Sequence, residues 1–290
     1  MAKQHVGKAR ELQVRSSDGT LLHVEVRGPE DGPTVVLSHC WATSLASWGP
    51  VVRELDPHMR VVLYDQRGHG RSQVPVTEAG YGTDKLADDL CAVLEATVPD
   101  GRKAVVAGHS MGGMTIMASG ARPTFQNKIE AVLLTNTGCT ELPSRARILP
   151  LPGPLRSLAA KTFLVTTLPL GPRNRATTAA LKYITMGKGA DPRMVRLGLR
   201  MVHECASVPR GRWGRVMSTL DLRDTASQIT VPTTVVVGTE DKMTPPWHAH
   251  HMADVIPGAS HPVEVPGVGH MGPLEMPGLL AEQIGKLVDA

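Results

Sequence analysis

Aromatic residues are scarce in this chain of 290 residues: Phe, Trp and Tyr together make up 3% of it. A chain of this length nevertheless buries about three quarters of its unfolded surface when it folds. Since 41% of the residues are hydrophobic, leucine, valine, methionine and alanine must fill the core. This composition is typical of an ordinary globular protein with one or two domains.

Long apolar runs and paired cysteines are also missing. No run approaches the roughly 18 apolar residues of a membrane helix, so we expect no transmembrane segment. The first ten residues, MAKQHVGKAR, are positively charged but precede no apolar stretch, which argues against a secretory signal. The cysteines form no CxxC pair, which argues against a disulfide framework or a zinc knuckle. Reduced thiols and a cytoplasmic location are the simplest interpretation.

Motifs for binding nucleotides and nucleic acids are absent as well. The chain has no Walker loop, no dinucleotide fingerprint and no nucleic-acid-binding motif. We therefore expect neither a nucleotide cofactor nor a nucleic-acid partner.

What the chain does have is an alternation of β-rich runs and helical patterns. Several runs are continuously apolar, as expected for parallel strands that are covered on both faces. The predicted strands are residues 21–28, 34–39, 60–66, 103–110, 129–136 and 233–240. Helical patterns follow at 84–96, where Asp84 is the expected N-cap, and at 247–256 and 279–290. This order predicts an α/β fold with a mostly parallel central sheet flanked by helices.

One block interrupts the alternation. Residues 139–226 contain prolines and helical patterns but no strand-like run, which predicts a helical cap inserted into a core made of residues 1–138 and 227–290. Residues 139–227 hold 15 Lys and Arg against 5 Asp and Glu, a net charge of +10, whereas the rest has −6. The arginines either form a solvated face, or they join the apolar stretch 161–172 in receiving an anionic or lipid-like substrate.

The segment GHSMGG, residues 108–113, follows an apolar run and precedes a helical pattern. It matches G-x-S-x-G, in which a sharp strand-to-helix turn holds the serine in a strained backbone geometry between small neighbours. The helix that begins near Met111 would turn its first amides toward this serine, where they stabilise negative charge. Ser110 is therefore the candidate nucleophile.

A nucleophilic serine needs a base, and the base needs an acid that orients it. His270 lies in VGHMGPLE, after the last strand-like segment. Asp241 follows the run 233–240, at the end of a strand where the sites of open α/β sheets lie. Glu240 is the alternative acid, but as the last residue of the strand pattern we expect it to point elsewhere.

The stretch SHCW, residues 38–41, ends another apolar run. A metal site would need more ligands than His39 and Cys40, and a catalytic thiol would need a base beside it. We therefore interpret Cys40 as a small residue in a tight turn. Three further histidines, His248, His250 and His251, are expected on a solvated helix face rather than at a metal site.

Five motifs together resemble those of the α/β-hydrolase superfamily over nearly the whole chain: SHCW, YDQRGHGRS (64–72), GHSMGG, GTEDKMTP and VGHMGPLE. The resemblance is to its esterase, cofactor-free perhydrolase and monoacylglycerol-lipase-like branch. It implies a triad of Ser110, Asp241 and His270, with an oxyanion hole made by the N–H groups of Trp41 and Met111. The chain departs from the family at Cys40, a position that is commonly glycine. In YDQRGHGRS we expect Asp65 and Arg67 to hold loops rather than to act in catalysis.

The expected function is hydrolysis of a carboxylic ester, small or lipid-like, through an acyl-enzyme on Ser110. We expect no cofactor and no metal. Acyl transfer, perhydrolysis and cleavage of a thioester or lactone are alternatives on the same residues. A non-catalytic small-molecule-binding protein is the alternative from another class. Ser110 argues against an aspartate nucleophile of the kind used by haloalkane dehalogenases and epoxide hydrolases. The acyl group, the alcohol and the oligomeric state are left open.

Overall fold

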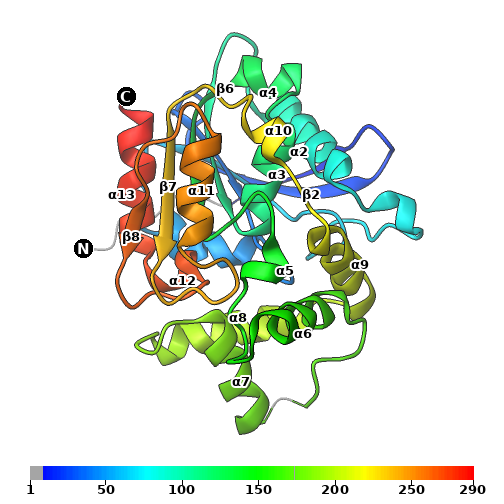
Figure 1. The fold of residues 1–290 in the computed structure, drawn as a ribbon. Coiled ribbons are helices and arrows are strands. Elements are labelled where there is room, and N and C mark those ends of the chain that lie inside the picture. Colours follow the sequence, from blue (N-terminus) through cyan, green and yellow to red (C-terminus); the bar gives the residue numbers. More distant parts are fainter. Residues whose placement is uncertain (1–8, 173) are drawn as a thin grey trace.

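Eight strands form a single sheet in the order β1-β2-β4-β3-β5-β6-β7-β8 in the computed structural model, which describes residues 9–172 and 174–290 (Figure 1). The strands are β1 (Arg10–Arg15), β2 (Leu21–Arg27), β3 (Thr34–Ser38), β4 (Arg60–Tyr64), β5 (Ala104–His109), β6 (Ile129–Thr135), β7 (Thr233–Gly238) and β8 (Val263–Val265). The pairs β1–β2 and β2–β4 are antiparallel, and the other pairs are parallel. The predicted fold class, an α/β fold with a mostly parallel sheet, is confirmed.

Helices cover both faces of this sheet because its central strands are apolar on both faces. In β3, Val35 and Leu37 join one core cluster and Val36 joins the other. Helices α2 (Thr83–Thr97) and α3 (Met111–Ser119) pack on the Val36 side, and α1 (Gly49–Val52) and α13 (Pro277–Val288) pack on the opposite side. Leucine, valine, methionine and alanine fill most of both clusters, as the scarcity of aromatics predicted.

The sequence analysis missed one strand and predicted one helix cap wrongly. Strand β1 was not predicted, because Val14 is its single buried residue and the rest of the strand is polar or partly exposed at the sheet edge. Asp84 is not the N-cap of α2: the cap is Gly82, and Asp84 lies within the first turn. Residues 1–8, which carry most of the charged N-terminal segment, and the cap residue Arg173 lie outside the described residues.

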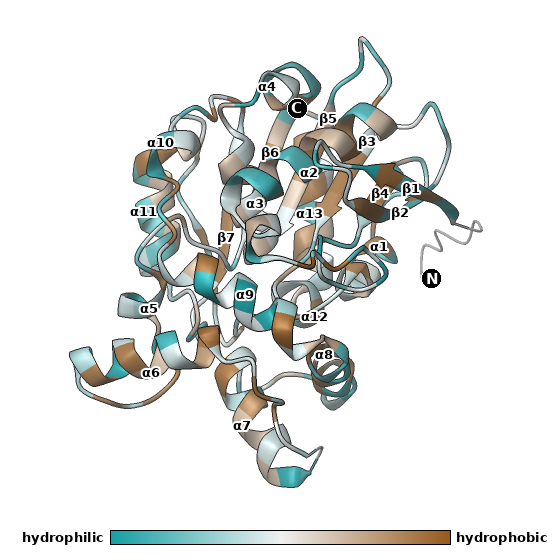
Figure 2. Ribbon diagram, turned by 90° about the vertical axis from the view of Figure 1, so that its right-hand side faces the viewer, coloured by the Kyte–Doolittle hydropathy of each residue, from teal (hydrophilic) through white to brown (hydrophobic). Residues whose placement is uncertain are grey.

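Between β6 and β7, the described chain forms helices without a strand. They are α5 (Leu142–Arg145), α6 (Gly153–Val165), α7 (Arg175–Thr185), α8 (Pro192–Glu204), α9 (Ser207–Ser218) and α10 (Arg223–Ala226). Figure 1 shows α6, α7 and α8 grouped below the sheet, and Figure 2 shows hydrophobic and hydrophilic residues alternating along α6 and α9. We call residues 139–226 the cap; the division into core and cap remains a prediction.

Two further findings concern the whole chain. None of the helices in residues 9–172 and 174–290 combines the length and the hydrophobicity needed to cross a bilayer. The four cysteines, Cys40, Cys91, Cys139 and Cys205, are free.

Candidate active site

Ser110 occupies a strained turn between β5 and α3. Its backbone has φ 52° and ψ −115°, a conformation that a residue with a side chain rarely adopts. The neighbouring glycines are needed for space, since a Cβ on Gly112 would lie 2.1 Å from the carbonyl oxygen of Ser38. The turn thus places the Ser110 hydroxyl between the end of a strand and the first amides of a helix.

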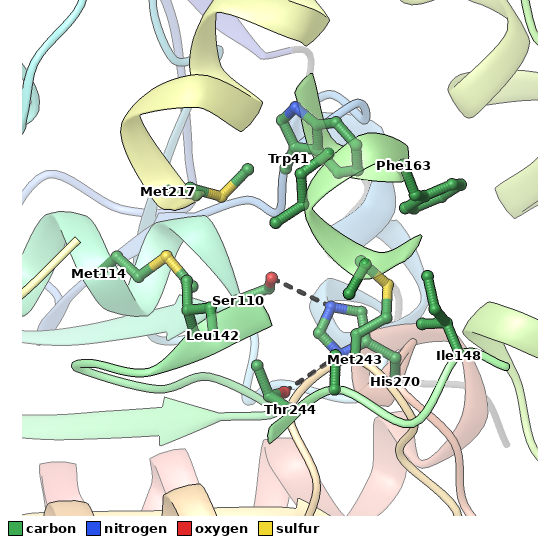
Figure 3. A pocket seen from close by; sticks show the side chains of 13 residues that line it. Trp41, Ser110, Met114, Leu142, Ile148, Phe163, Met217, Met243, Thr244 and His270 are labelled. Carbon is green, nitrogen blue, oxygen red and sulfur yellow. Dashed lines mark hydrogen bonds between the residues drawn. The ribbon is translucent and has the colours of Figure 1, made fainter. Parts of the chain in front are cut away.

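The structure brings Ser110, His270 and Asp241 together, although 160 residues separate the first two in the chain. The Nε2 atom of His270 lies 3.0 Å from Ser110 Oγ, and its Nδ1 atom lies 2.9 Å from Asp241 Oδ2. Figure 3 shows Ser110 and His270 facing each other beside Trp41 and Phe163. All three polar side chains are buried. This geometry allows a proton to pass from the serine to the imidazole.

The carboxylate of Asp241 is held by groups that the sequence analysis missed. Its Oδ1 atom accepts hydrogen bonds from the amides of Met243 (2.8 Å) and Thr244 (2.9 Å). Its Oδ2 atom accepts from Thr244 Oγ1 (2.8 Å) and Asn136 Nδ2 (3.0 Å). The available signal for Asn136 was its place directly after β6, because the ends of neighbouring parallel strands meet at one edge of a sheet.

Burial and charge act in opposite directions on the His270–Asp241 pair. Burial alone would lower the pKa of His270, but the Asp241 carboxylate outweighs it and raises this pKa above its ordinary value of 6.5. Burial would likewise raise the pKa of Asp241, but the charge and hydrogen bond of His270 keep it lowered. Glu240 forms no hydrogen bond with His270 in the described part of the chain; its Oε2 atom accepts instead from the amide of Lys188 at 2.8 Å.

The two N–H groups expected at an oxyanion hole are free. Neither Trp41 N nor Met111 N donates a hydrogen bond to any described residue. Trp41 follows β3 and is anchored by its side chain, whose Nε1 donates to the carbonyl oxygen of Arg210 at 2.9 Å. The loop is supported further by His69, whose Nε2 accepts from the amide of Ala42 at 3.1 Å. Both free donors are therefore available to an anionic oxygen near Ser110.

The two residues before Trp41 have buried partners that the sequence did not indicate. His39 uses both ring nitrogens, Nδ1 against the carbonyl oxygen of Cys40 (2.7 Å) and Nε2 as acceptor from the amide of Gln66 (2.9 Å). Burial also lowers the pKa of His39 to about 4. The interpretation of Cys40 as a small residue in a tight turn stays a prediction, but the sequence did not indicate its neighbours: its Sγ atom and ring nitrogens of His109 and His270 lie within 4.8 Å of one another. The long-range fold brings the His270 loop over SHCW.

This trio has donor atoms that could hold a metal ion. A metal bound there would occupy a nitrogen of His270, so it would compete with the base role of this residue whenever it took Nε2. A second such group, Glu11, His23 and Glu25, lies on β1 and β2. There Arg71 and Arg27 already pair with the two carboxylates.

The YDQRGHGRS motif has the expected structural role. Asp65 accepts hydrogen bonds from the amides of Leu45 (2.8 Å) and Arg71 (2.9 Å), which fixes two loops. The buried guanidinium of Arg67 pairs with Asp89 and Asp18.

The expectation for the α11 histidines was wrong in one case. Helix α11 (Trp247–Val255) buries His248, which is 1% exposed, because this face of the helix packs close to Gly138. Burial lowers the pKa of His248 to about 4, so it is neutral.

Two apolar pockets meet at Ser110 and His270, and they hold about 440 and 460 Å³ of empty space when the part that opens to solvent is included. Trp41, Phe163 and Met243 line both of them. The first extends along Met114, Leu142, Ile148 and Leu164, and the second along Cys40, Thr43, Leu181 and Arg210. No acidic residue lines either cavity in the described part of the chain.

Comparison with known proteins places this site in context. A model of the family described as "Alpha/beta hydrolase family" matches residues 35–283. The chain is 39% identical over 123 residues to a non-heme chloroperoxidase of Streptomyces lividans, a match that covers 42% of this chain and 43% of that protein. It is 25% identical over 270 residues to 3-oxoadipate enol-lactonase 1 of Acinetobacter baylyi, and here the match covers 92% of both.

Solved structures show the same fold. An esterase from Exiguobacterium antarcticum superimposes with a TM-score of 0.80 at 20% identity, covering 97% of this chain and 100% of that one. The enol-lactonase from Burkholderia xenovorans LB400 has a TM-score of 0.76 at 25% identity, covering 96% of this chain and 100% of the other.

Proposed function

The chain belongs to the alpha/beta hydrolase family, and from that premise we propose that this enzyme is a serine hydrolase that cleaves a carboxylic ester. The observation that carries the proposal is the pair of hydrogen bonds made by His270. Its Nε2 atom lies 3.0 Å from Ser110 Oγ, and its Nδ1 atom lies 2.9 Å from Asp241 Oδ2. A buried carboxylate, imidazole and hydroxyl in this order are the groups that acyl transfer requires.

In the proposed reaction, Ser110 Oγ attacks the ester carbonyl while its proton moves to His270 Nε2. Asp241 stabilises the imidazolium, and the N–H groups of Trp41 and Met111 bind the oxyanion. The intermediate collapses when His270 gives its proton to the departing alcohol, which leaves an acyl-enzyme. A water molecule then attacks the acyl carbonyl while His270 takes its proton. The bond to Ser110 Oγ breaks, His270 returns the proton to Oγ, and the carboxylic acid is released.

The apolar lining of both cavities supports a substrate with a medium or long apolar portion. The stretch 161–172, which the sequence analysis linked to acyl binding, contributes Phe163 and Leu164 to one cavity and Phe163 and Leu170 to the other. A panel of p-nitrophenyl esters of rising acyl length measures this directly. Rates that peak at the shortest chain would contradict it. The cytoplasmic location remains part of this proposal.

Lactone cleavage is the second candidate, since it uses the same steps with the leaving alcohol tethered to the acyl group. The observation that favours it is the match with an enol-lactonase over 92% of both chains. Comparing kcat/KM for lactones and open-chain esters of equal carbon number separates the two.

The decisive variant is Ser110→Ala. Because the three residues act as a unit, we expect ester hydrolysis to fall by several orders of magnitude without loss of folding. Labelling by a fluorophosphonate, which requires an activated serine, should also vanish. Ser144→Ala, at an exposed serine of the cap, is the matched control and should behave as wild type. Hydrolysis by Ser110→Ala within tenfold of wild type would refute the assignment.

A further inference from the structure

Arg210 on α9 is a buried arginine that lacks a carboxylate partner. Arg210 is only 3% exposed, yet its guanidinium forms no ion pair with any described residue. Three exposed or half-exposed cap arginines do form such pairs: Arg145, Arg215 and Arg223 pair with Glu141, Glu78 and Asp221. A guanidinium removed from water without a counter-charge is costly, so an unpaired one calls for a functional explanation.

Few of the N–H donors of this guanidinium form hydrogen bonds within the protein. Its Nη2 donates to the carbonyl oxygen of Leu168, and its buried Nε has no hydrogen-bond partner. A guanidinium has five N–H donors in all. Cys205 does not neutralise it, because burial raises the pKa of that thiol to about 11 and keeps it uncharged.

The location of Arg210 connects it with the proposed chemistry. It lines the second cavity together with Ser110 and His270, and no acidic residue shares that lining. Its backbone is fixed there, since its carbonyl oxygen accepts the 2.9 Å hydrogen bond from Trp41 Nε1. The lining of this cavity is mostly apolar, and Arg210 is the single Lys, Arg, Asp or Glu among the described residues that line it together with Ser110.

We propose that Arg210 is the anion-binding group of the substrate site, and that the substrate is an ester or lactone carrying a carboxylate away from its scissile carbonyl. A planar carboxylate matches the guanidinium fork with two parallel hydrogen bonds. A singly charged carboxylate also costs less to desolvate in an apolar cavity than a doubly charged phosphate. The inference rests on the proposed function for its catalytic consequence, but binding of the anion does not require Ser110.

The kinetic test compares substrates that differ only in charge. Each p-nitrophenyl monoester of a linear dicarboxylic acid, over a series of chain lengths, is paired with the same compound methylated at its free acid. The wild type should prefer the acid at one chain length. Arg210→Gln should lower kcat/KM for the acid by about 10- to 100-fold, mainly through KM, because a hydrogen bond to a charged group is lost. The methylated partner should change by less than about threefold.

Two variants separate direct pairing of Arg210 with the substrate carboxylate from a general effect of removing a positive charge. Arg210→Lys keeps the charge and should retain part of the preference for the acid. Arg200→Gln removes the same charge from an exposed position on α8 and should leave both substrates near wild type. Equal losses on acid and methylated ester in Arg210→Gln would mean that Arg210 only supports Trp41 and Leu168, and would overturn the proposal.

A binding measurement isolates the site from the reaction. Calorimetry should detect binding of the free dicarboxylates to the Ser110→Ala variant. This binding should disappear in the double variant that also carries Arg210→Gln. If no ester is hydrolysed but this binding is seen, the proposed function fails and the anion site stands. Dicarboxylate binding that is absent, or that is equal with and without Arg210, overturns the anion site whatever the enzyme hydrolyses.

Discussion

At the scale of single residues, the site is a buried polar network whose outer members hold the inner ones. Asn136 has a positive φ of 48°, and its amide bridges Asp241 Oδ2 and the carbonyl oxygen of Gly269 at 3.0 and 2.9 Å. It therefore ties the acid to the loop that carries His270. Thr244 adds a hydroxyl that contacts Asp241 Oδ2 at 2.8 Å and His270 Nδ1 at 3.3 Å. Such a network restricts the imidazole to one orientation.

The roles of the two adjacent acids can be separated by matched substitutions. Asp241→Asn should lower kcat by roughly 10⁴-fold, because the amide favours the wrong tautomer of His270. Glu240→Gln should stay near wild type, since that side chain contacts the amide of Lys188 instead. Steady-state kinetics on one ester compares them. Reversed severities would identify Glu240 as the acid.

The pH profile follows from the charge of His270. The imidazole must be neutral to accept the Ser110 proton, and the Asp241 carboxylate raises its pKa above 6.5. For a neutral ester, kcat/KM should therefore rise with pH along a limb whose midpoint lies above 6.5. In Asp241→Asn the residual activity should have its midpoint at lower pH, because burial then acts without the carboxylate. A wild-type midpoint below 6.5 would contradict this account of the pair.

At the scale of elements, the cap and the His270 loop are fastened to each other. The amides of His270 and Met271 both donate to the carbonyl oxygen of Thr185, at the end of α7, at 3.0 and 3.1 Å. Glu275 accepts from the amide of Gly187 just beyond α7 at 2.8 Å and from the amide of Gly269 at 3.1 Å. The position of the proposed base therefore depends on a cap helix as well as on the sheet.

Close packing inside the cap predicts how two glycine substitutions change the free energy of unfolding. Helices α6 and α9 approach so closely that a Cβ on Gly214 would lie 1.8 Å from the carbonyl oxygen of Leu164. Gly214→Ala should cost about 1–3 kcal/mol of unfolding free energy. Gly285→Ala, where a Cβ meets nothing within 4 Å on helix α13, should instead gain up to about 1 kcal/mol. Thermal or urea unfolding measures both, and similar shifts for the two alanines would show that the α6–α9 contact is not tight.

At the scale of the whole molecule, charge is divided unevenly. The cap has a net charge of +10 and the rest of the chain −6. The cap residues lie over the cavities that contain Ser110, since Phe163, Leu164 and Arg210 line them. If the basic residues of the cap surround the opening of these cavities, their charge raises the local concentration of anionic substrates.

The dependence of kcat/KM on salt concentration tests whether the basic cap attracts anionic substrates. The Debye length shrinks from roughly 30 Å at 0.01 M to about 10 Å at 0.1 M. Over this range kcat/KM for an anionic ester should fall, while that of its neutral partner of equal length should stay flat. Equal responses would mean that the exposed arginines are only a solvated face. A contact with Arg210 is buried and should be screened less, so preference for the anion should survive at high salt.

Local signals in the sequence were enough to predict much of this protein. The β-rich runs predicted β2 to β7, and the clearest of these were the apolar runs of β3, β4 and β5, which are buried along their whole length. GHSMGG predicted the turn at Ser110 because its geometry requires small neighbours within a few residues. The family and fold class followed from such motifs. The edge strand β1 escaped because its burial is confined to Val14.

Only the tertiary structure decided which distant groups share one space. Cys40 stands beside His270, Asn136 holds Asp241, and Arg210 lines a cavity with Ser110, although each pair is far apart in the chain. None of these contacts has a local pattern. Each arises where loops from separate strand ends and a cap helix pack together, and the burial and charge of a side chain in such a place are set by its neighbours in space rather than by its neighbours in sequence.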